Sequence, residues 1–442
     1  MTKAQFNQPY IPNTDSDRSQ MLEAINADSV DELFLDIPEN YRNPALNIGD
    51  PLSEMEIKSK LNELAESNFQ VSADSSFLGA GVYRHFVPAV VPSLITRGEF
   101  LTSYTPYQPE VSQGTLQGTY EFQTITAQIL GMEVANAGMY DGATALAEAA
   151  LMACRITKRY RVAVLNSVNP KYVEVVQTYT APQGIEIYII DEGGEDTHLD
   201  QETACLLVQY PNYWGQVHNL EVLAEKVHSY GALLCASSDP VACAMFRSPG
   251  SMGVDIATGE GQALGIPPSF GGPFVGLFAT KKDYLRQLPG RIVGKTIDTE
   301  GRTGYVLTLQ PREQHIRRER ATSNICTSTA LIGLWATVWT ALMGKNGLRH
   351  LAELTYQKSH YAASQIAQIP GFSVDLERVF FQEFVVRCPV PYSDVNKHLE
   401  NHGIVGGADV SESFTNGVLF CVTEVNSRKK IDLLVAALRE LS

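Results

Sequence analysis

Strands and helices alternate through the middle of this chain, and that alternation most restricts the folds it can adopt. Apolar runs that predict strands occupy residues 161–166, 185–190, 204–210 and 232–237, with helical patterns before Tyr179 and from Asn219 to Tyr230. Because strands joined through helices run side by side in one direction, the pattern predicts an α/β fold, a mainly parallel sheet with helices on both faces. Ligands of such sheets bind at the carboxyl ends of the strands. These ends carry Gln209, Asn212, Ser237 and Asp239.

Three parts are predicted for the 442 residues, of which 44% are hydrophobic, enough for a large core. Residues 1–70 have the pattern of an N-terminal arm, in which Ser53 and Glu56 form a capping-box pair ahead of a short helix. We expect this arm to pack on a surface other than its own. Residues 71–325 are predicted to form the large domain and residues 326–442 a smaller α+β domain.

Charge and cysteine content exclude several classes of function. The chain has 49 acidic and 34 basic residues, a net charge of −15, and lacks a basic stripe, which argues against nucleic acid or an anionic membrane as a partner. The seven cysteines are scattered without CxxC spacing, so neither a disulfide framework nor a zinc site is indicated, and we expect no metal. The N-terminal residues resemble neither a secretory signal nor a transit peptide, which predicts a cytoplasmic protein.

One uncharged segment, Ile325 to Gly344, has about the number of residues that a helix needs to span a bilayer. It contains several threonines, stands alone, and lies in the middle of the chain. We therefore predict a buried helix at a domain or subunit junction rather than a membrane span.

Glycines are concentrated between Gly253 and Lys282, where two apolar runs, residues 254–258 and 274–280, enclose a loop with five of them. The pattern predicts strand, loop and strand, and such a loop suits close approach to a cofactor. Pro267 and Pro268 argue against a nicotinamide site, because they prevent the helix that a dinucleotide fingerprint must open. Residues 290–296 fall one residue short of a phosphate-binding NTPase loop, and a hairpin explains them better.

Three further segments allow two interpretations each. Gly142, Ala143 and Thr144 open an Ala-rich helix, either as a phosphate-binding turn or as an ordinary start capped by Asp141 or Thr144. The aromatic, loop-like residues 77–123 either line a site or pack on the surface, with four candidates for the lining: Tyr83, Tyr104, Tyr107 and Gln108. The basic residues 310–327 form either a solvated helix with local ion pairs or an anion-binding or subunit-contact segment.

The Gly-rich loop resembles the Schiff-base loop of aspartate-aminotransferase-type enzymes that use pyridoxal phosphate (PLP). More of the chain is similar to the N-terminal half of glycine decarboxylase, the P protein of the glycine cleavage system, through SYTPYQPEVSQG, MYDGATALAEA, GEGQALGIPPSFGGP, LPGRIVG and REQHIRRERATSNICT. The similarity covers most of the chain and is that of the separate α subunit (subunit 1) of the split bacterial enzyme. Where that family carries a His-Lys pair, this chain has Gln262 and Ala263, and Ala263 has no amine to form an aldimine.

The resemblance implies a type I PLP-dependent transferase fold in each of an α and a β subunit, in an expected α2β2 assembly. It implies decarboxylation of glycine with release of CO2 and transfer of the aminomethyl group to the lipoyl group of the H protein. PLP and its lysine are expected on the β subunit, and this chain is not expected to be active alone.

The resemblance also implies roles for particular residues. Shared-site or interface contributors are expected at Tyr104, Tyr107, Gln108, Thr322 and Ser323. A relic cofactor pocket is expected at Gly142, Ala143, Thr144, Asn212 and Asp239. By residue count, the partner of the cofactor's pyridinium nitrogen falls on Ser237, and Asp239 comes two residues late.

Two alternatives remain open at this point. The chain could be a self-sufficient PLP enzyme whose lysine is displaced to Lys281, Lys282 or Lys295. It could instead be a scaffold that only stabilises its partner or docks the lipoyl carrier. Mutation of each lysine tests the first alternative, because it would abolish or spare a PLP adduct. Replacing Tyr104 and Tyr107 by Phe in an intact complex tests the second, because a scaffold would keep normal turnover.

Overall fold

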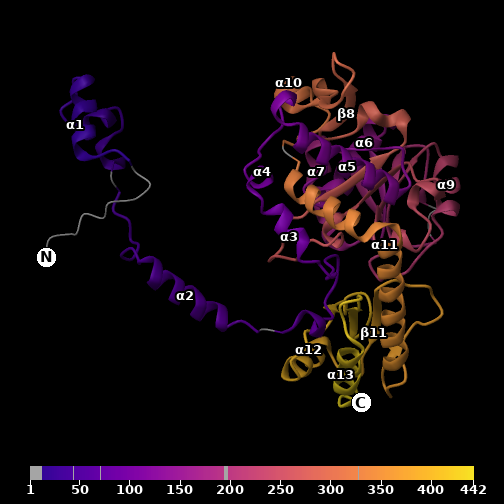
Figure 1. Cartoon of the computed structure of the whole chain (residues 1–442). Coiled ribbons are helices and arrows are strands. Elements are labelled where there is room, and N and C mark those ends of the chain that lie inside the picture. The colour runs from indigo at the N-terminus through magenta and orange to yellow at the C-terminus, as the bar shows by residue number, and fades with distance from the viewer. Residues whose placement is uncertain (1–11, 43, 70, 194–197, 327) are drawn as a thin grey trace. The chain divides into compact units, whose positions relative to one another are not determined.

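The computed structural model describes residues 12–42, 44–69, 71–193, 198–326 and 328–442. The chain divides into two compact units, Met1–Gln70 and Val71–Ser442, and each is described by itself. Figure 1 labels the main elements of both. The α-helices are α1 Asp15–Ala24, α2 Glu54–Glu66, α3 Val90–Ile95, α4 Gly98–Leu101, α5 Gln113–Leu130, α6 Gly142–Thr157, α7 Pro170–Thr180, α9 Leu220–Ser229, α10 Gln314–Arg317, α11 Ala330–Ile366, α12 Tyr392–Asn401 and α13 Arg428–Arg439.

The first unit is helical but contributes no core of its own. Thr14 and Ser53 close capping boxes with Asp17 and Glu56 at the starts of α1 and α2, as the sequence predicts for Ser53. None of its described residues, 12–42 and 44–69, is buried, and its large apolar side chains face outward. Ile48 and Met55, for example, are 77% and 79% exposed. Apolar surface of this extent favours contact with another chain.

A seven-stranded sheet forms the centre of the second unit, in the order β1-β7-β6-β5-β4-β2-β3. Its strands are β1 Val134–Ala135, β2 Arg161–Leu165, β3 Glu186–Ile190, β4 Thr203–Tyr210, β5 Leu233–Ser238, β6 Ile256–Glu260 and β7 Gly276–Thr280. Strands β3, β2, β4, β5 and β6 are parallel neighbours, whereas β7 pairs antiparallel with both β6 and β1. The predicted strands are confirmed to within two residues at each end. The predicted strand, Gly-rich loop and strand are β6, the loop and β7.

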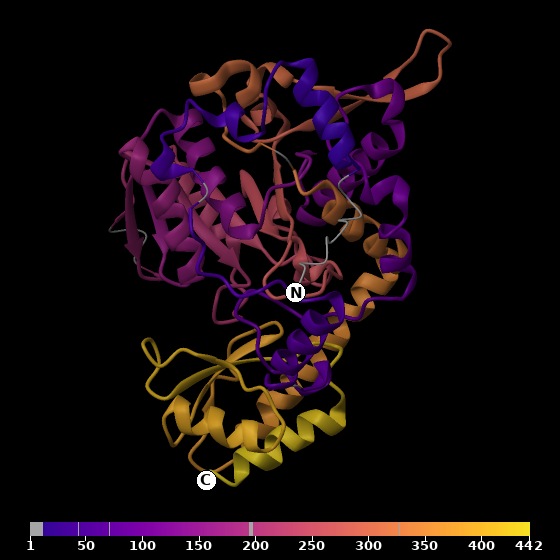
Figure 2. The ribbon, with the colours of Figure 1, turned by 90° about the vertical axis from the view of Figure 1, so that its left-hand side faces the viewer.

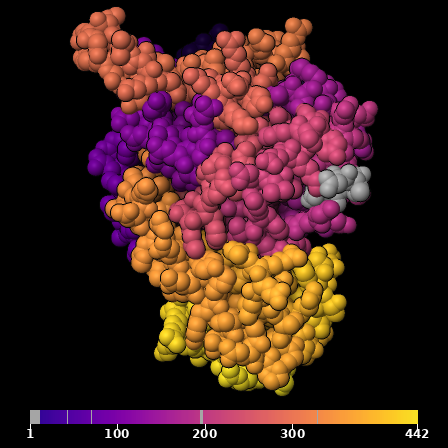
Figure 3. All heavy atoms as spheres, turned by 90° about the vertical axis from the view of Figure 1, so that its right-hand side faces the viewer, coloured from indigo at the N-terminus to yellow at the C-terminus, as the bar shows by residue number. Residues whose placement is uncertain are grey.

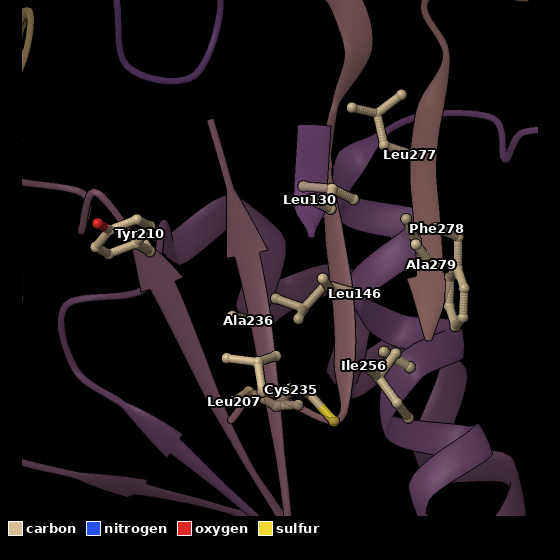
Figure 4. Packing of buried hydrophobic residues seen from close by; sticks show 14 of the residues in the cluster. Leu130, Leu146, Leu207, Tyr210, Cys235, Ala236, Ile256, Leu277, Phe278 and Ala279 are labelled. Carbon is tan, nitrogen blue, oxygen red and sulfur yellow. The ribbon is translucent and has the colours of Figure 1, made fainter. Parts of the chain in front are cut away.

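Helix packing buries the sheet on both faces. Every residue of β5 and all but one of β4 are buried, as expected for central parallel strands covered on both sides. Helix α6 contacts β4, β5, β6 and β7, and most of its residues are buried alanines or larger apolar side chains. Figure 4 shows Leu146 of α6 facing the strands that carry Ala236 and Ile256. This packing fixes the N-terminus of α6 at the carboxyl ends of the parallel strands.

The expectation of a loop through residues 77–123 is wrong at its end, because the 18-residue helix α5 begins at Gln113. Gly114 and Gly118 are unfavourable in helices, so the sequence pattern there did not predict one. Gly118 is nevertheless needed for helix packing. A side-chain Cβ at Gly118 would lie 3.1 Å from Leu334 of α11, so the small residue lets the two helices approach closely.

Residues 330–344 of the uncharged segment form the first half of α11, as predicted for a helix, but this half is only partly buried, and Leu342 is 51% exposed. Trp339 on this helix is completely buried. Gly344 interrupts the helix with φ 61°, and the second half continues to the C-terminal domain, as Figure 1 shows. Within the described part of the chain, no helix combines the length and apolar character needed to cross a membrane.

The C-terminal residues build a second core on a four-stranded antiparallel sheet, in the order β10-β11-β13-β12. Its strands are β10 Ser373–Val374, β11 Glu383–Arg387, β12 Ala408–Asp409 and β13 Gly417–Cys421. Ala362, Ala363 and Ile366 at the end of α11 join this core, together with the apolar face of α13. The cap of α13 is Ser427, whose side chain accepts a hydrogen bond from the Lys430 N–H. In Figure 3 this part, orange to yellow, lies directly against the α/β part.

A two-stranded hairpin, β8 Ile292–Ile297 and β9 Thr303–Thr308, projects from the α/β part, as Figure 2 shows. It confirms the hairpin predicted for the segment that falls short of an NTPase loop. The basic residues that follow form short helical turns, including α10, rather than one solvated helix. Arg312 holds these turns to the base of the hairpin, donating hydrogen bonds to the carbonyls of Leu288 and Gly290.

Candidate functional site

The carboxyl ends of β4, β5 and β6 meet residues 381–383 of the C-terminal part around a cavity of about 30 Å³. Its lining comprises Gly81, Tyr83, Tyr172, Gln209, Pro211, Asn212, Gly215, Ser237, Ser238, Asp239, Glu260, Phe381, Gln382 and Glu383. The position agrees with the rule that α/β sheets bind ligands at this edge. One buried water needs about 10–15 Å³ by this measure, so the space holds about two water molecules.

Glu260, the last residue of β6, extends to the N-terminus of α6. Its Oε2 accepts a hydrogen bond of 2.8 Å from the Gly142 N–H, and its Oε1 accepts one of 2.9 Å from the Gln262 N–H. A Cβ placed on Gly142 would lie 2.8 Å from Tyr172 Oη and 3.0 Å from Glu260 Cβ. Asp141 caps the helix by accepting from the Thr144 N–H at 2.7 Å. Protein carboxylates therefore accept from two of the three N–H groups of the predicted phosphate turn, those of Gly142 and Thr144.

Glu383 joins the C-terminal part to the segment that precedes α3. Its carboxylate accepts hydrogen bonds of 2.6 Å from the Tyr83 hydroxyl and from the Ala80 N–H. Tyr83, one of the four aromatic-region candidates, thus lines the cavity as predicted, and both side chains are buried.

Asp239 also lines the cavity, just beyond the end of β5. It accepts hydrogen bonds from the N–H groups of Val241 and Ala242 at 2.7 and 2.8 Å and from the Gln382 amide at 2.7 Å. Asn212 also lines the cavity, but its side-chain oxygen accepts from the N–H groups of Trp214 and Gln216 and so holds a turn. Both predicted pocket residues are therefore at the cavity, each bonded to protein groups.

The cavity is acidic, because its lining includes three carboxylates and no lysine, arginine or histidine. Burial is the main cause that raises the pKa of Glu260 to about 8 and that of Glu383 to about 7, against the opposing effect of their hydrogen-bond donors. Burial likewise raises the pKa of Asp239. Because its lining has no cationic side chain, the cavity offers a phosphate dianion no counter-charge.

Gln262 and Ala263 lie in a short 3-10 turn, Gly261–Ala263, next to the cavity but outside its lining. The Gln262 amide accepts from the Tyr83 N–H at 2.8 Å and donates to the Tyr83 and Ile266 carbonyls. Ala263 is 1% exposed. Gln262 thus ties the Gly-rich loop to the segment before α3.

The three lysines of the autonomous alternative lie elsewhere. Lys281 follows β7 and pairs with Asp255 at the amino end of β6, the opposite end of that strand from Glu260. Lys282 is exposed beside it, and Lys295 is exposed on the hairpin strand β8. None of them lines the strand-end cavity.

A second, larger cavity of about 300 Å³ lies beside the hairpin, and Tyr104, Pro273, Arg291 and Thr329 are among its lining residues. Tyr104 itself is 80% exposed. The cavity brings the aromatic segment, the end of the Gly-rich loop and the start of α11 together.

Tyr107 belongs to a charged cluster on the same face. Its hydroxyl accepts a hydrogen bond of 3.1 Å from Arg291, whose guanidinium also lies 5.3 Å from the centre of the Tyr107 ring. Arg291 pairs with Glu313 at 3.3 Å, both side chains being under 8% exposed, and His315 lies 3.5 Å from the same carboxylate. Two motifs that are distant in sequence therefore meet here.

The other predicted interface residues lie around this cluster. Gln108 is exposed, and Thr322 is partly buried, with its N–H bonded to the Arg312 carbonyl at 3.0 Å. Ser323 donates a hydrogen bond of 3.0 Å to Glu148, a buried carboxylate of α6 whose pKa burial raises. Ser323 thus has a structural partner inside the chain.

One group of described side chains has the composition of a metal site. His398, His402 and Glu440 bring ligand atoms within 4.8 Å of one another on the C-terminal part. His398 Nε2 already bonds the Ala437 carbonyl at 2.9 Å, and Glu440 is exposed. The group is remote from both cavities and bridges α12 and α13.

Sequence reasoning missed Tyr172, Glu260 and Glu383 as cavity residues. Glu260 carried a signal, since it is an acid between two glycines at the end of an apolar strand. Tyr172 and Glu383 carried none, because only the tertiary fold brings α7 and the start of β11 to the same edge.

A sequence model of the glycine cleavage system P-protein family matches residues 8–438. The chain belongs to this P-protein family. It is 48% identical to relatives from Thermomicrobium roseum and Desulforamulus reducens, both named probable glycine dehydrogenase (decarboxylating) subunit 1. The alignments cover 98% of this chain and 99% and 100% of those relatives. The P-protein resemblance inferred from the motifs is thereby confirmed.

Solved structures place the P-protein chain in the type I fold of PLP-dependent enzymes. A glycine decarboxylase (P-protein) of the glycine cleavage system, in inhibitor-bound form, matches with a TM-score of 0.93 and 41% identity, over 98% of this chain and all of that one. A sphingosine-1-phosphate lyase from Burkholderia pseudomallei matches with a TM-score of 0.66 and 13% identity, over 92% of this chain and 94% of that one. The second match shows the fold alone, and the predicted fold class is confirmed.

The residues of this chain's own strand-end cavity do not fit PLP. A PLP site needs a lysine for the aldehyde and N–H donors for the phosphate. The cavity lining contains no lysine, and a carboxylate already accepts from the Gly142 N–H.

Proposed function

We propose that this chain is the non-Schiff-base subunit of a split glycine decarboxylase. With a catalytic β subunit, expected as α2β2, it would form a complex that releases CO2 from glycine and transfers the aminomethyl group to the lipoyl group of the H protein. The observation that carries the proposal is the strand-end cavity, which has no lysine and whose phosphate turn is filled by Glu260. PLP and its lysine then belong to the partner, where the cofactor supplies the electron sink for loss of CO2.

The face with Tyr104, Tyr107 and Arg291 is proposed to complete the partner's site. The Arg291–Glu313 pair fixes the Tyr107 ring, because the guanidinium both bonds its hydroxyl and lies near its ring. Tyr104 stays exposed beside a cavity large enough for part of a substrate or a lipoyl arm. These residues would position groups and exclude water. Gln108, Thr322 and Ser323 are proposed as neighbours of that contact.

Borohydride trapping tests the proposal directly. The purified chain, alone and mixed with a candidate β subunit, is incubated with PLP and reduced, and the labelled lysine is located by peptide mass. Label on the partner alone, with glycine turnover only in the mixture, is the expected result. Label on Lys281, Lys282 or Lys295 of this chain would instead establish the autonomous alternative. In that case, replacing the labelled lysine by arginine would abolish the label.

A scaffold role is the second candidate, since Ser323 and Gln262 both have structural partners inside the chain. It differs from the main proposal in whether Tyr104 and Tyr107 affect turnover once the complex has formed.

A further inference from the structure

The N-terminus of α6 has the form of an anion cradle that this chain fills itself. Helix α6 is 16 residues long and presents the Gly142 N–H at the carboxyl edge of the sheet, where a helix dipole favours negative charge. The group that accepts this N–H is the Glu260 carboxylate, at 2.8 Å. The same carboxylate accepts from the Gln262 N–H, so each oxygen has one backbone donor.

We propose that Glu260 is an internal substitute for a bound phosphate, and that occupation of the cradle by its side chain closes this chain's own pocket to phosphate monoesters, PLP included. The missing lysine explains why no aldimine forms, but not why a cofactor could not bind noncovalently. The filled cradle explains the second point. This inference shares with the proposed function only the premise that the chain has the fold of a PLP-dependent enzyme.

The packing around the N-terminus of α6 indicates that the Glu260 side chain excludes phosphate by occupying its place, rather than by charge repulsion alone. Tyr172 and Glu260 cover Gly142 so closely that even one added carbon atom would be 2.8–3.0 Å from them. Glu260 is anchored at the end of β6, and Gly259 and Gly261 on either side pack against backbone at Ser238 and Val275. Glu260→Ala keeps the Cβ and backbone atoms of these contacts but removes the two carboxyl oxygens that accept from the Gly142 and Gln262 N–H groups, so those donors become free for an anion.

Phosphate binding to the full chain tests this, with inorganic phosphate as the probe and chloride at equal ionic strength as reference. Wild type should show no phosphate-dependent rise in Tm and no heat of binding. Glu260→Ala should bind phosphate with a dissociation constant on the order of 1 mM, at least about tenfold tighter than wild type, and gain Tm as phosphate is added. The Ala variant should also take up PLP without forming a borohydride-stable adduct.

Two matched variants show whether phosphate is excluded by the volume of the Glu260 side chain or by its negative charge. Glu260→Gln keeps the side-chain volume and an acceptor for the Gly142 N–H, so it should remain closed to phosphate. Glu383→Ala removes a carboxylate from the same cavity but leaves the cradle filled, and should also bind no phosphate. Equal phosphate binding by all three variants would overturn the proposal, as would phosphate binding by wild type or none by a folded Glu260→Ala.

If Glu260→Ala does not fold in chloride, refolding in phosphate decides. Recovery of folded protein in phosphate but not in chloride supports the proposal, and equal failure in both overturns it. Because no turnover is measured, failure of the subunit assignment would appear in the borohydride labelling and leave these binding results unaffected.

Discussion

At the scale of single residues, the strand-end cavity is defined by acidic side chains that accept hydrogen bonds from other groups of the same chain. Glu260, Glu383 and Asp239 each accept at least two hydrogen bonds, mostly from backbone N–H groups. Hydrogen bonding favours the charged forms, but burial outweighs it and raises the pKa of all three. The cavity therefore couples folding to pH.

Glu260→Gln should flatten the dependence of stability on pH. The pKa of Glu260 is about 8 in the folded chain against an ordinary value of 4.5, so the folded state binds the extra proton between these values. Its contribution is thus fully present below pH 4.5 and is lost as the pH rises through 8, with a slope of at most about 1.4 kcal/mol per pH unit. Urea unfolding of the full chain between pH 5.5 and 8.5 measures this slope.

Glu63→Gln, an exposed glutamate of α2, is the control and should leave the pH slope of wild type unchanged. An identical slope for wild type and Glu260→Gln would show that Glu260 does not hold its proton in the folded chain.

Tyr107→Phe should lower turnover of the assembled complex by about tenfold, because a site built by two chains depends on positioning. The change removes the hydroxyl that Arg291 bonds at 3.1 Å but keeps the ring. Steady-state kinetics with the β subunit and H protein measures kcat, and sedimentation checks assembly. Tyr361→Phe, which loses a hydroxyl bonded to Asp432 on the C-terminal part, is the matched control. Full activity of an assembled Tyr107→Phe complex would favour the scaffold role.

At the scale of elements, the Gly-rich loop and α11 depend on close packing at one glycine. Gly265 has φ 77°, and a Cβ there would come within 2.2–2.4 Å of the Trp339 ring. Trp339 is fully buried and donates to the Phe86 carbonyl at 2.9 Å, so its ring cannot move away freely. This contact fixes the loop that contains Gln262 and Ala263.

Gly265→Ala should lower the free energy of unfolding by about 2–4 kcal/mol, the sum of an overpacking and a left-handed backbone penalty. Gly271→Ala in the same loop isolates the backbone part, because Gly271 also has positive φ, 105°, but nothing lies within 4 Å of an added Cβ. Chemical denaturation of both variants gives the difference. Equal losses would mean that Trp339 yields and that the contact does not fix the loop.

Elements were predictable from sequence where period and composition agree. Strands β2 to β7 were located because each is an apolar run bounded by turn residues, whereas α5 was missed because Gly114 and Gly118 imitate a loop. The helix start at Gly142 was located, and Asp141 proved to be its cap. Its second acceptor, Glu260, could not be identified, since that bond joins residues far apart in sequence. Local signals cannot report such contacts.

At the scale of the whole molecule, the division into residues 1–70, 71–325 and 326–442 remains our proposal for the domain organisation. The C-terminal core does draw on residues from α11 onward, and also on Phe77. The first unit has apolar side chains without a core to bury them in. We propose that the arm contacts the partner subunit.

Deleting residues 1–70 should leave the Tm of the chain within about 2 °C of wild type, since no described arm residue is buried. It should also weaken assembly with the β subunit by at least about tenfold, because exposed apolar surface of this kind contributes through association. Sedimentation of the mixed subunits across a range of concentrations measures this. Full-strength assembly of the truncated chain would remove the arm from the interface.

The filled anion cradle also changes how the pocket moves. An enzyme site must open in every cycle to admit and release ligands, but here the amides of Ala80, Gly142, Val241 and Gln262 are bonded to side chains that never leave. These amides should exchange their hydrogens with solvent only when the domain unfolds. Substitutions in this region should then lower the stability of the fold, so the same hydrogen bonds that close the cavity also make its wall rigid.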